Sequence, residues 1–226
     1  MDSFCKTKSD EIELSLGHKV PSSIKAVVTG GSAGGMEALS EVLRVLPSDF
    51  PVPILVVNHL HPSDRGLFAL HLGMRLTLPV SEAVDKQPIE PGHVYVAPSN
   101  YHLLVESDHT FSLSTDEKVN WSRPSIDVLF ESASRVWGDA LVCVVLSGAN
   151  NDGAEGAFLI KTCGGVVVAQ DPATAEHPFM PRAAIERAGI DIILPPAEIG
   201  RLLLKVVKTG RLSDETAQVQ HEGGVR

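Results

Sequence analysis

Short, uninterrupted apolar segments that end in turns constrain the fold of this chain more than any other feature. The clearest are Lys25–Val28, Ile54–Val57 and Ala140–Leu146. Because these segments lack polar alternation, they are typical of parallel strands buried on both faces of a sheet. Segments of helical periodicity separate them, and this alternation predicts an α/β fold. We expect a doubly wound, mostly parallel sheet in a Rossmann-like three-layer arrangement.

The same periodicity predicts the other elements. Helices are expected at residues 36–46, 67–76, 125–137, 153–162, 181–188 and 197–207, and further strands at 166–169 and 191–194. Ser125 is expected to cap the helix that ends at Trp137. The middle of the chain is less regular, with short strands expected at 79–84, 93–97, 102–106 and 111–113. Turn residues between the last three predict two hairpin-like pairs, hence a small antiparallel hairpin region.

The length and composition indicate one globular domain. A chain of 226 residues with 43% hydrophobic residues can bury a substantial core. We expect this domain at residues 24–208, with flexible tails at 1–23 and 209–226, where periodicity is weak. The net charge of −9 argues against nucleic acid as a partner. No signal peptide or membrane-length apolar segment is visible, so we expect a cytoplasmic protein without membrane insertion.

Polar residues follow the three apolar segments. Ser32, His59 and Asp152 each lie in a turn directly after one of them. The carboxyl ends of parallel strands meet at one edge of the sheet, so we expect these side chains to gather there. Residues 30–34 also match the G-x-S-x-G pattern of a nucleophile elbow, in which glycines allow a sharp strand-to-helix turn. Together the three residues predict a Ser-His-Asp catalytic triad of an esterase or amidase.

These residues also have other interpretations. A dinucleotide-binding loop lacks its second glycine, and a phosphate-binding P-loop lacks its Lys-Ser/Thr pair, whereas a purely structural turn remains open. His61 is a rival base to His59, and a zinc site on both would lack a recognisable third ligand. We therefore expect no metal and no cofactor. Asp152 would serve equally well in a turn or as a helix N-cap.

Several separate motifs resemble one known family. They are residues 30–35 (GGSAGG), His59, residues 90–98 (EPGHVYVAP), residues 123–130 (RPSIDVLF), residues 146–153 (LSGANNDG) and residues 179–182 (FMPR). In order and spacing they are similar to the catalytic domain of the chemotaxis protein-glutamate methylesterase family, of the CheB type. The resemblance runs from about Ile24 to about Lys208.

The resemblance implies a function and a set of site residues. It implies hydrolysis of glutamate 5-methyl esters on the cytoplasmic helices of chemoreceptors, with release of methanol, and deamidation of receptor glutamines in some members. The nucleophile, base and acid of the family fall on Ser32, His59 and Asp152, which favours His59 over His61. Residues expected near the oxyanion or substrate groove are Ala33, Ala149, Asn150, Arg123, Met180 and Arg182.

The chain departs from the family at identifiable places. Ala33 stands where many members have threonine, and Ala149-Asn150 replaces a Met-Gly pair. The residues before Ile24 are too few for the receiver domain that usually restrains the esterase. We therefore expect a stand-alone esterase or a piece of a longer chain, with a separate response regulator or other chemosensory protein as partner. Two alternatives stay open: a non-catalytic module that binds receptors, and a general small-molecule carboxylesterase.

Overall fold

The computed structural model describes residues 23–190 and 192–219. Its centre is a seven-stranded parallel sheet with the strand order β3-β4-β2-β1-β7-β8-β9. The strands are β1 (Ala26–Gly31), β2 (Ile54–Asn58), β3 (Val80–Glu82), β4 (Val94–Val96), β7 (Leu141–Val145), β8 (Val166–Gln170) and β9 (Ile192–Leu194). The predicted doubly wound α/β fold is confirmed, and β1 lies at the middle of the sheet.

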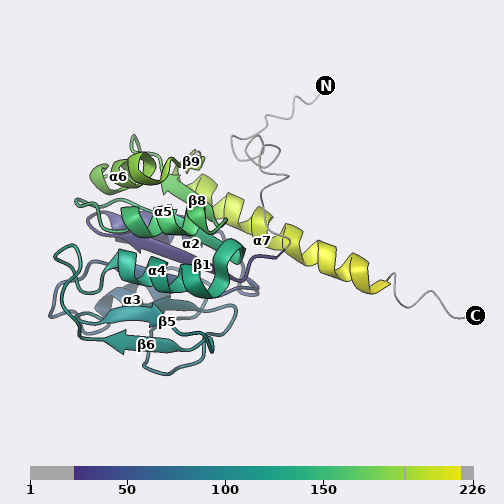
Figure 1. The fold of residues 1–226 in the computed structure, drawn as a ribbon, viewed down its shortest axis with the longest axis horizontal. Helices are drawn as coiled ribbons and strands as arrows, with labels where there is room; N and C mark the ends of the chain where they lie inside the picture. Colours follow the sequence, from purple (N-terminus) through teal and green to yellow (C-terminus); the bar gives the residue numbers. More distant parts are fainter. Residues whose placement is uncertain (1–22, 191, 220–226) are drawn as a thin grey trace, which may run out of the picture.

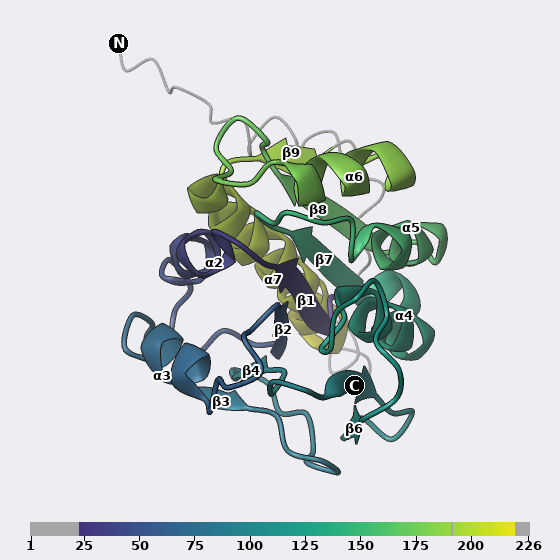
Figure 2. The same cartoon turned by 90° about the vertical axis from the view of Figure 1, so that its left-hand side faces the viewer.

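Helices cover both faces of the sheet (Figures 1 and 2). On one face lie α2 (Gly35–Leu43), α3 (Leu67–Gly73) and α7 (Pro196–Val219). On the other lie α4 (Ile126–Trp137), α5 (Ala154–Thr162) and α6 (Phe179–Ala188). A short 3₁₀ turn, η1 (Gly138–Ala140), connects α4 to β7.

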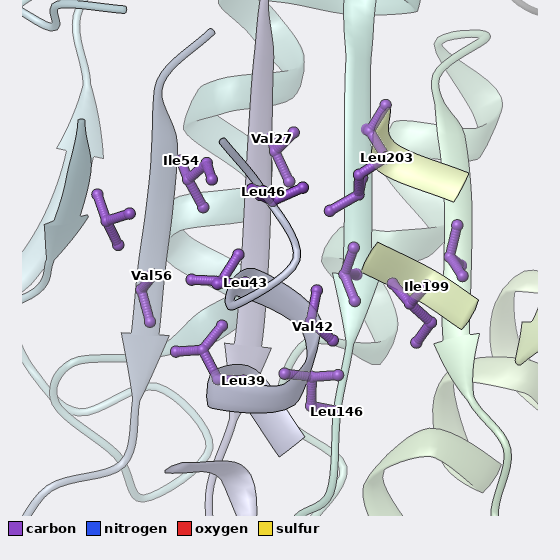
Figure 3. Packing of buried hydrophobic residues seen from close by; sticks show 14 of the residues in the cluster. Val27, Leu39, Val42, Leu43, Leu46, Ile54, Val56, Leu146, Ile199 and Leu203 are labelled. Carbon is purple, nitrogen blue, oxygen red and sulfur yellow. The ribbon is translucent and has the colours of Figure 1, made fainter. Parts of the chain in front are cut away.

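Successive strand residues pack into two separate hydrophobic cores, because side chains alternate between the two faces of a strand. In β1, Val27 joins the core under α2 and α7, whereas Val28 joins the core under α4, α5 and α6. Figure 3 shows the first core, in which Leu39 and Leu43 of α2 pack over the strands. Both faces of β1 and β7 are therefore buried, which accounts for their continuous apolar sequences.

The middle of the chain corrects one prediction. An antiparallel hairpin is present, formed by β5 (His102–Val105) and β6 (Phe111–Ser114), and it packs against α4. The other expected hairpin, between residues 93–97 and 102–106, is wrong. Instead, β4 pairs in parallel with both β2 and β3 inside the main sheet. Its three residues are all buried, and a central position satisfies an apolar strand better than a hairpin edge.

The helix boundaries differ by a few residues from those expected, and α7 continues to Val219. Of the expected tails, residues 1–22 and 220–226 lie outside the described residues.

Candidate active site

Three turns at the carboxyl edge of the sheet bring Ser32, His59 and Asp152 into one region. In the β1–β2 pair Gly31 lies opposite Asn58, so Ser32 and His59 leave the sheet side by side. The backbone N–H of His59 donates to Gly31 O at 3.1 Å. On the other side of β1, the backbone N–H of Ser32 donates to Ser147 O at 2.9 Å, at the start of the turn that carries Asp152.

His59 and Asp152 form a buried hydrogen-bonded pair. Nε2 of His59 lies 2.8 Å from Oδ2 of Asp152, and the side chains are 14% and 0% exposed. Because a carboxylate accepts, Nε2 carries the hydrogen and Nδ1 of the neutral ring is left as the basic nitrogen. His61 is exposed and pairs with Ser63 Oγ instead. Of the two candidate histidines, His59 is the one in contact with the acid.

Ser32 occupies the turn between β1 and α2 with its side chain half-buried. Within the described residues, its hydroxyl makes no hydrogen bond to His59. The contact between His59 and Asp152 is therefore formed, whereas the hydroxyl of Ser32 is not hydrogen-bonded to the imidazole in the described part of the chain. Catalytic hydrogen bonds of this kind commonly tighten only when substrate is bound.

The N-terminus of α4 holds the Asp152 carboxylate. Oδ2 accepts a hydrogen bond from the Ile126 backbone N–H at 2.7 Å, and Oδ1 accepts one from the Asp127 N–H at 3.2 Å. Ser125, which was expected to cap this helix, occupies the N-cap position but makes no side-chain cap hydrogen bond. Its hydroxyl donates to Asp152 Oδ1 at 2.8 Å. The prediction that the Ser125 side chain caps α4 is therefore wrong. The Asp152 carboxylate, from another part of the chain, accepts the N–H groups at the start of the helix instead.

These donors decide the charge of Asp152. Burial alone would raise the pKa of its carboxyl, but hydrogen bonds from His59, Asn120 and Ile126 outweigh burial and lower the pKa below its ordinary value. The neighbouring Asp127 behaves in the opposite way. Burial, reinforced by the negative charge of Asp152, raises the pKa of Asp127 to about 6. The carboxylate that contacts His59 is therefore the one kept ionised.

Ser147 fixes the turn that carries Ser32. Its buried hydroxyl donates to Ala33 O at 2.8 Å and accepts the His177 backbone N–H at 2.9 Å. Gly34 has a φ of 72°, in the left-handed region that favours glycine. A Cβ on Gly35 would lie 2.3 Å from Asn58 Oδ1, so a larger residue at the start of α2 would displace the Asn58 side chain.

The other expected site residues lie in different surroundings. Ala33 and Ala149 are exposed beside the turns, and Asn150 Nδ2 lies 3.5 Å from His59 Nδ1. Nη1 of Arg123 donates to Thr115 O and Asp116 O, which closes the loop before α4.

The two expected residues on α6 face opposite ways. Met180 is fully buried, and its side chain fills the space where a Cβ on Gly148 would lie. Arg182 is exposed.

Sequence reasoning missed Asn120, Ser125 and Ser147 as part of this site. Asn120 Nδ2 lies 2.9 Å from Asp152 Oδ1, although 32 residues separate them. Asn120 and Ser125 do not follow a predicted strand, whereas Ser147 directly follows the apolar segment 140–146 but makes its site contacts with residues distant along the chain. The available signal for Asn120 was weak: an asparagine in a short polar segment favours a turn with positive φ.

Comparisons with known proteins find similarity to a single family. Residues 27–203 match the family described as CheB methylesterase. A relative from Leptospira interrogans is 48% identical over 182 residues, which cover 80% of this chain and 94% of that relative. A Thermotoga maritima relative, named protein-glutamate methylesterase/protein-glutamine glutaminase, is 36% identical over 81% of this chain and 54% of its own length.

The fold has a solved counterpart. The crystal structure of the Thermotoga maritima CheB methylesterase catalytic domain matches with a TM-score of 0.79 and 36% sequence identity. The match covers 82% of this chain and 100% of that one. In the described residues, no helix has the length and apolarity needed to span a bilayer.

Proposed function

The chain belongs to the CheB methylesterase family, and we propose that Ser32, His59 and Asp152 carry out its ester hydrolysis. Like its named relatives, it is a protein-glutamate methylesterase/protein-glutamine glutaminase of chemotaxis. The observation that carries the residue assignment is the 2.8 Å contact between His59 and Asp152, next to the turn of Ser32. The catalytic domain spans residues 24–208 in this proposal.

The mechanism begins with proton transfer from Ser32 Oγ to Nδ1 of His59. The oxygen attacks the side-chain carbonyl carbon of a glutamate methyl ester, and Asp152 stabilises the imidazolium that results. Backbone N–H groups near Ala33, at the start of α2, stabilise the negative oxygen of the tetrahedral intermediate. Methanol leaves with the proton from His59. A water molecule then gives a proton to His59 and attacks the glutamyl carbonyl carbon, and the Ser32 oxygen leaves with that proton from His59.

The substrate in this proposal is a methylated glutamate on a cytoplasmic helix of a chemoreceptor, so the enzyme works in the cytoplasm. The substrate groove in this proposal is shaped by Ala149, Asn150, Arg123, Met180 and Arg182. Met180 contributes from beneath Gly148. A separate response regulator or other chemosensory protein is the expected partner.

Methanol release from methylated receptor membranes tests the proposal directly. The wild type is expected to release methanol, whereas Ser32→Ala and His59→Gln should lose about 10⁴- to 10⁶-fold in kcat. An active-site serine phosphonate should label the wild type and not Ser32→Ala. Methanol release by Ser32→Ala at the wild-type rate would refute the assignment. Fast turnover of p-nitrophenyl esters with no activity on receptor would instead indicate a general esterase.

A further inference from the structure

Asn120 lies between the buried carboxylate of Asp152 and the partly buried carboxylate of Asp127. Its amide nitrogen is 2.9 Å from Asp152 Oδ1 and 2.7 Å from Asp127 Oδ2. A primary amide carries two hydrogens on one nitrogen, so it can donate one to each carboxylate at the same time. A hydroxyl could satisfy only one of them, and a carboxylate or carbonyl in this place would be repelled by both.

The backbone around Asn120 holds the amide in position. Val119 and Ser122 exchange two backbone hydrogen bonds of 3.2 and 2.9 Å, which leaves Asn120 and Trp121 as the two residues of a tight turn. Both have positive φ, 50° and 62°. Asparagine tolerates this conformation better than most residues, and the two contacts of Arg123 brace the same loop. The amide is therefore aimed by the turn before substrate arrives.

We propose that Asn120 is a positioning residue that keeps Asp152 charged and oriented toward His59 by donating one hydrogen to each of the two carboxylates. This inference rests on the proposed function of Asp152 as the acid of a triad. Two carboxylates this close would otherwise share a proton, as like charges disfavour joint ionisation. With the amide between them, any proton taken up by the pair goes to Asp127, whose pKa is the raised one.

The surroundings of Asp127 favour a proton on Asp127 and a negative charge on Asp152. The Gly156 backbone N–H donates to its other oxygen at 2.7 Å. The ionisable groups that face it are Asp152, buried Cys143 of β7, and Glu155, Glu186 and Arg187 around a pocket of about 610 Å³. Arg187 is paired with Glu155 at 2.7 and 2.8 Å, which leaves the Asn120 amide as a direct donor to the Asp127 side chain. Asn120 and Asp127 both line this pocket.

The decisive variant is Asn120→Asp, which keeps the shape of the side chain and replaces its two donors with acceptors. We expect kcat for methanol release to fall about 10- to 100-fold, as for loss of a hydrogen bond to a charged group. The acidic limb of the pH–rate profile should move to higher pH, because Asp152 then takes up a proton more readily. Ser122→Ala is the matched control, since within the described residues its hydroxyl donates a hydrogen bond only to the Asn120 carbonyl, at 3.3 Å in the same turn. It should stay within about twofold of wild type.

A second pair of variants separates electrostatics from packing. Asn120→Ala should also move the acidic limb to higher pH, and adding Asp127→Asn should move it back, since the negative charge of a second carboxylate then no longer raises the pKa of Asp152. A double-mutant cycle measures this coupling. An unmoved limb in both Asn120 variants, or no reversal in the double variant, would overturn the proposal.

A spectroscopic measurement keeps this inference separable from the proposed function. The imidazole N–H proton between His59 and Asp152 can be followed by NMR as the pH is lowered, and its disappearance in His59→Gln assigns it. We expect it to be lost at higher pH in Asn120→Asp than in wild type or Ser122→Ala. Absence of methanol release with this NMR difference present would refute the proposed reaction but support Asn120. Identical NMR titrations in all three proteins would refute Asn120.

Discussion

Asp152 combines a proposed catalytic role with a structural one, because the same carboxylate contacts His59 and caps α4. Removing it leaves the Ile126 N–H and the Ser125 hydroxyl without their buried acceptor. Asp152→Ala should therefore lower the free energy of unfolding by about 2 kcal/mol or more, and kcat by about 10⁴-fold. Ser32→Ala should lose activity without losing stability. Urea unfolding of the two variants checks this, and equal stability of Asp152→Ala and wild type would contradict it.

At the residue scale, local sequence patterns predict some residues of the site. They do not predict others, because the roles of those residues depend on contacts between distant parts of the chain. Ser32, His59 and Asp152 lie in the turns that follow buried strands, and strand ends are recognisable from apolar segments and turn residues. Asn120 and Ser147 matter through contacts with residues distant along the chain. The contacts of Asn120 depend on how the loop before α4 packs, and those of Ser147 depend on how the turn after β1 and the loop before α6 come together. No local pattern encodes either arrangement.

At the element scale, the site depends on how closely α4 approaches β1. A Cβ on Gly30 would lie 2.3 Å from Ile126 Cγ2, at the first residue of α4. Gly30→Ala should therefore push the start of α4 away and disturb the donors to Asp152. We expect a loss of about 1–3 kcal/mol in stability, as for other overpacked cores, together with reduced kcat.

Gly73→Ala is the matched control for this prediction. A Cβ there would meet Val80 at 3.5 Å, an ordinary contact at the end of α3. It should leave activity unchanged and stability within about 1 kcal/mol of wild type. Thermal unfolding and methanol assays of both variants provide the comparison, and equal behaviour of the two would show that α4 tolerates displacement.

The elements themselves were predictable where one local signal dominated. Continuous apolar segments gave β1, β2 and β7, and periodicity gave the helices to within a few residues in most cases. The hairpin expected between residues 93–97 and 102–106 failed because turn residues follow β4 even though it pairs within the main sheet. The Ser125 cap failed because a buried carboxylate replaced the local side chain. In both cases tertiary contacts overrode a correct local preference.

For the whole molecule, the order of the strands explains why the site lies where it does. From β1 the chain first proceeds to β2, and it later returns to β7 on the opposite side of β1. The carboxyl end of β1 is therefore where the winding reverses, and loops diverge at such a point to leave a crevice. Ser32 follows β1 and Asp152 follows β7, which places them on the two sides of this reversal. A doubly wound fold was predictable from the alternation of elements, but the strand order was not.

Asp127 should also make the free energy of unfolding of the whole molecule depend on pH. Burial first, and then the charge of Asp152, raise its pKa from 3.8 to about 6. The folded state therefore holds this proton more tightly than the unfolded state. The resulting stabilisation is complete below about pH 4 and is lost as the pH rises to about 6. A shift of this size corresponds to about 2–3 kcal/mol.

Urea unfolding between about pH 4 and pH 7 isolates the Asp127 contribution when wild type is compared with Asp127→Asn. Other groups add their own pH dependence to the stability of both proteins. Asp152 has a lowered pKa, so its contribution to stability is lost as the pH falls, opposite to that of Asp127. The difference between the two proteins should change by about 2–3 kcal/mol in favour of the variant as the pH rises. Exposed Asp139 supplies the control, because Asp139→Asn removes a carboxylate away from the buried pair. If the difference in free energy of unfolding between wild type and Asp127→Asn does not change with pH, Asp127 is ionised throughout this range. The two carboxylates would then both be charged, with no proton held by Asp127.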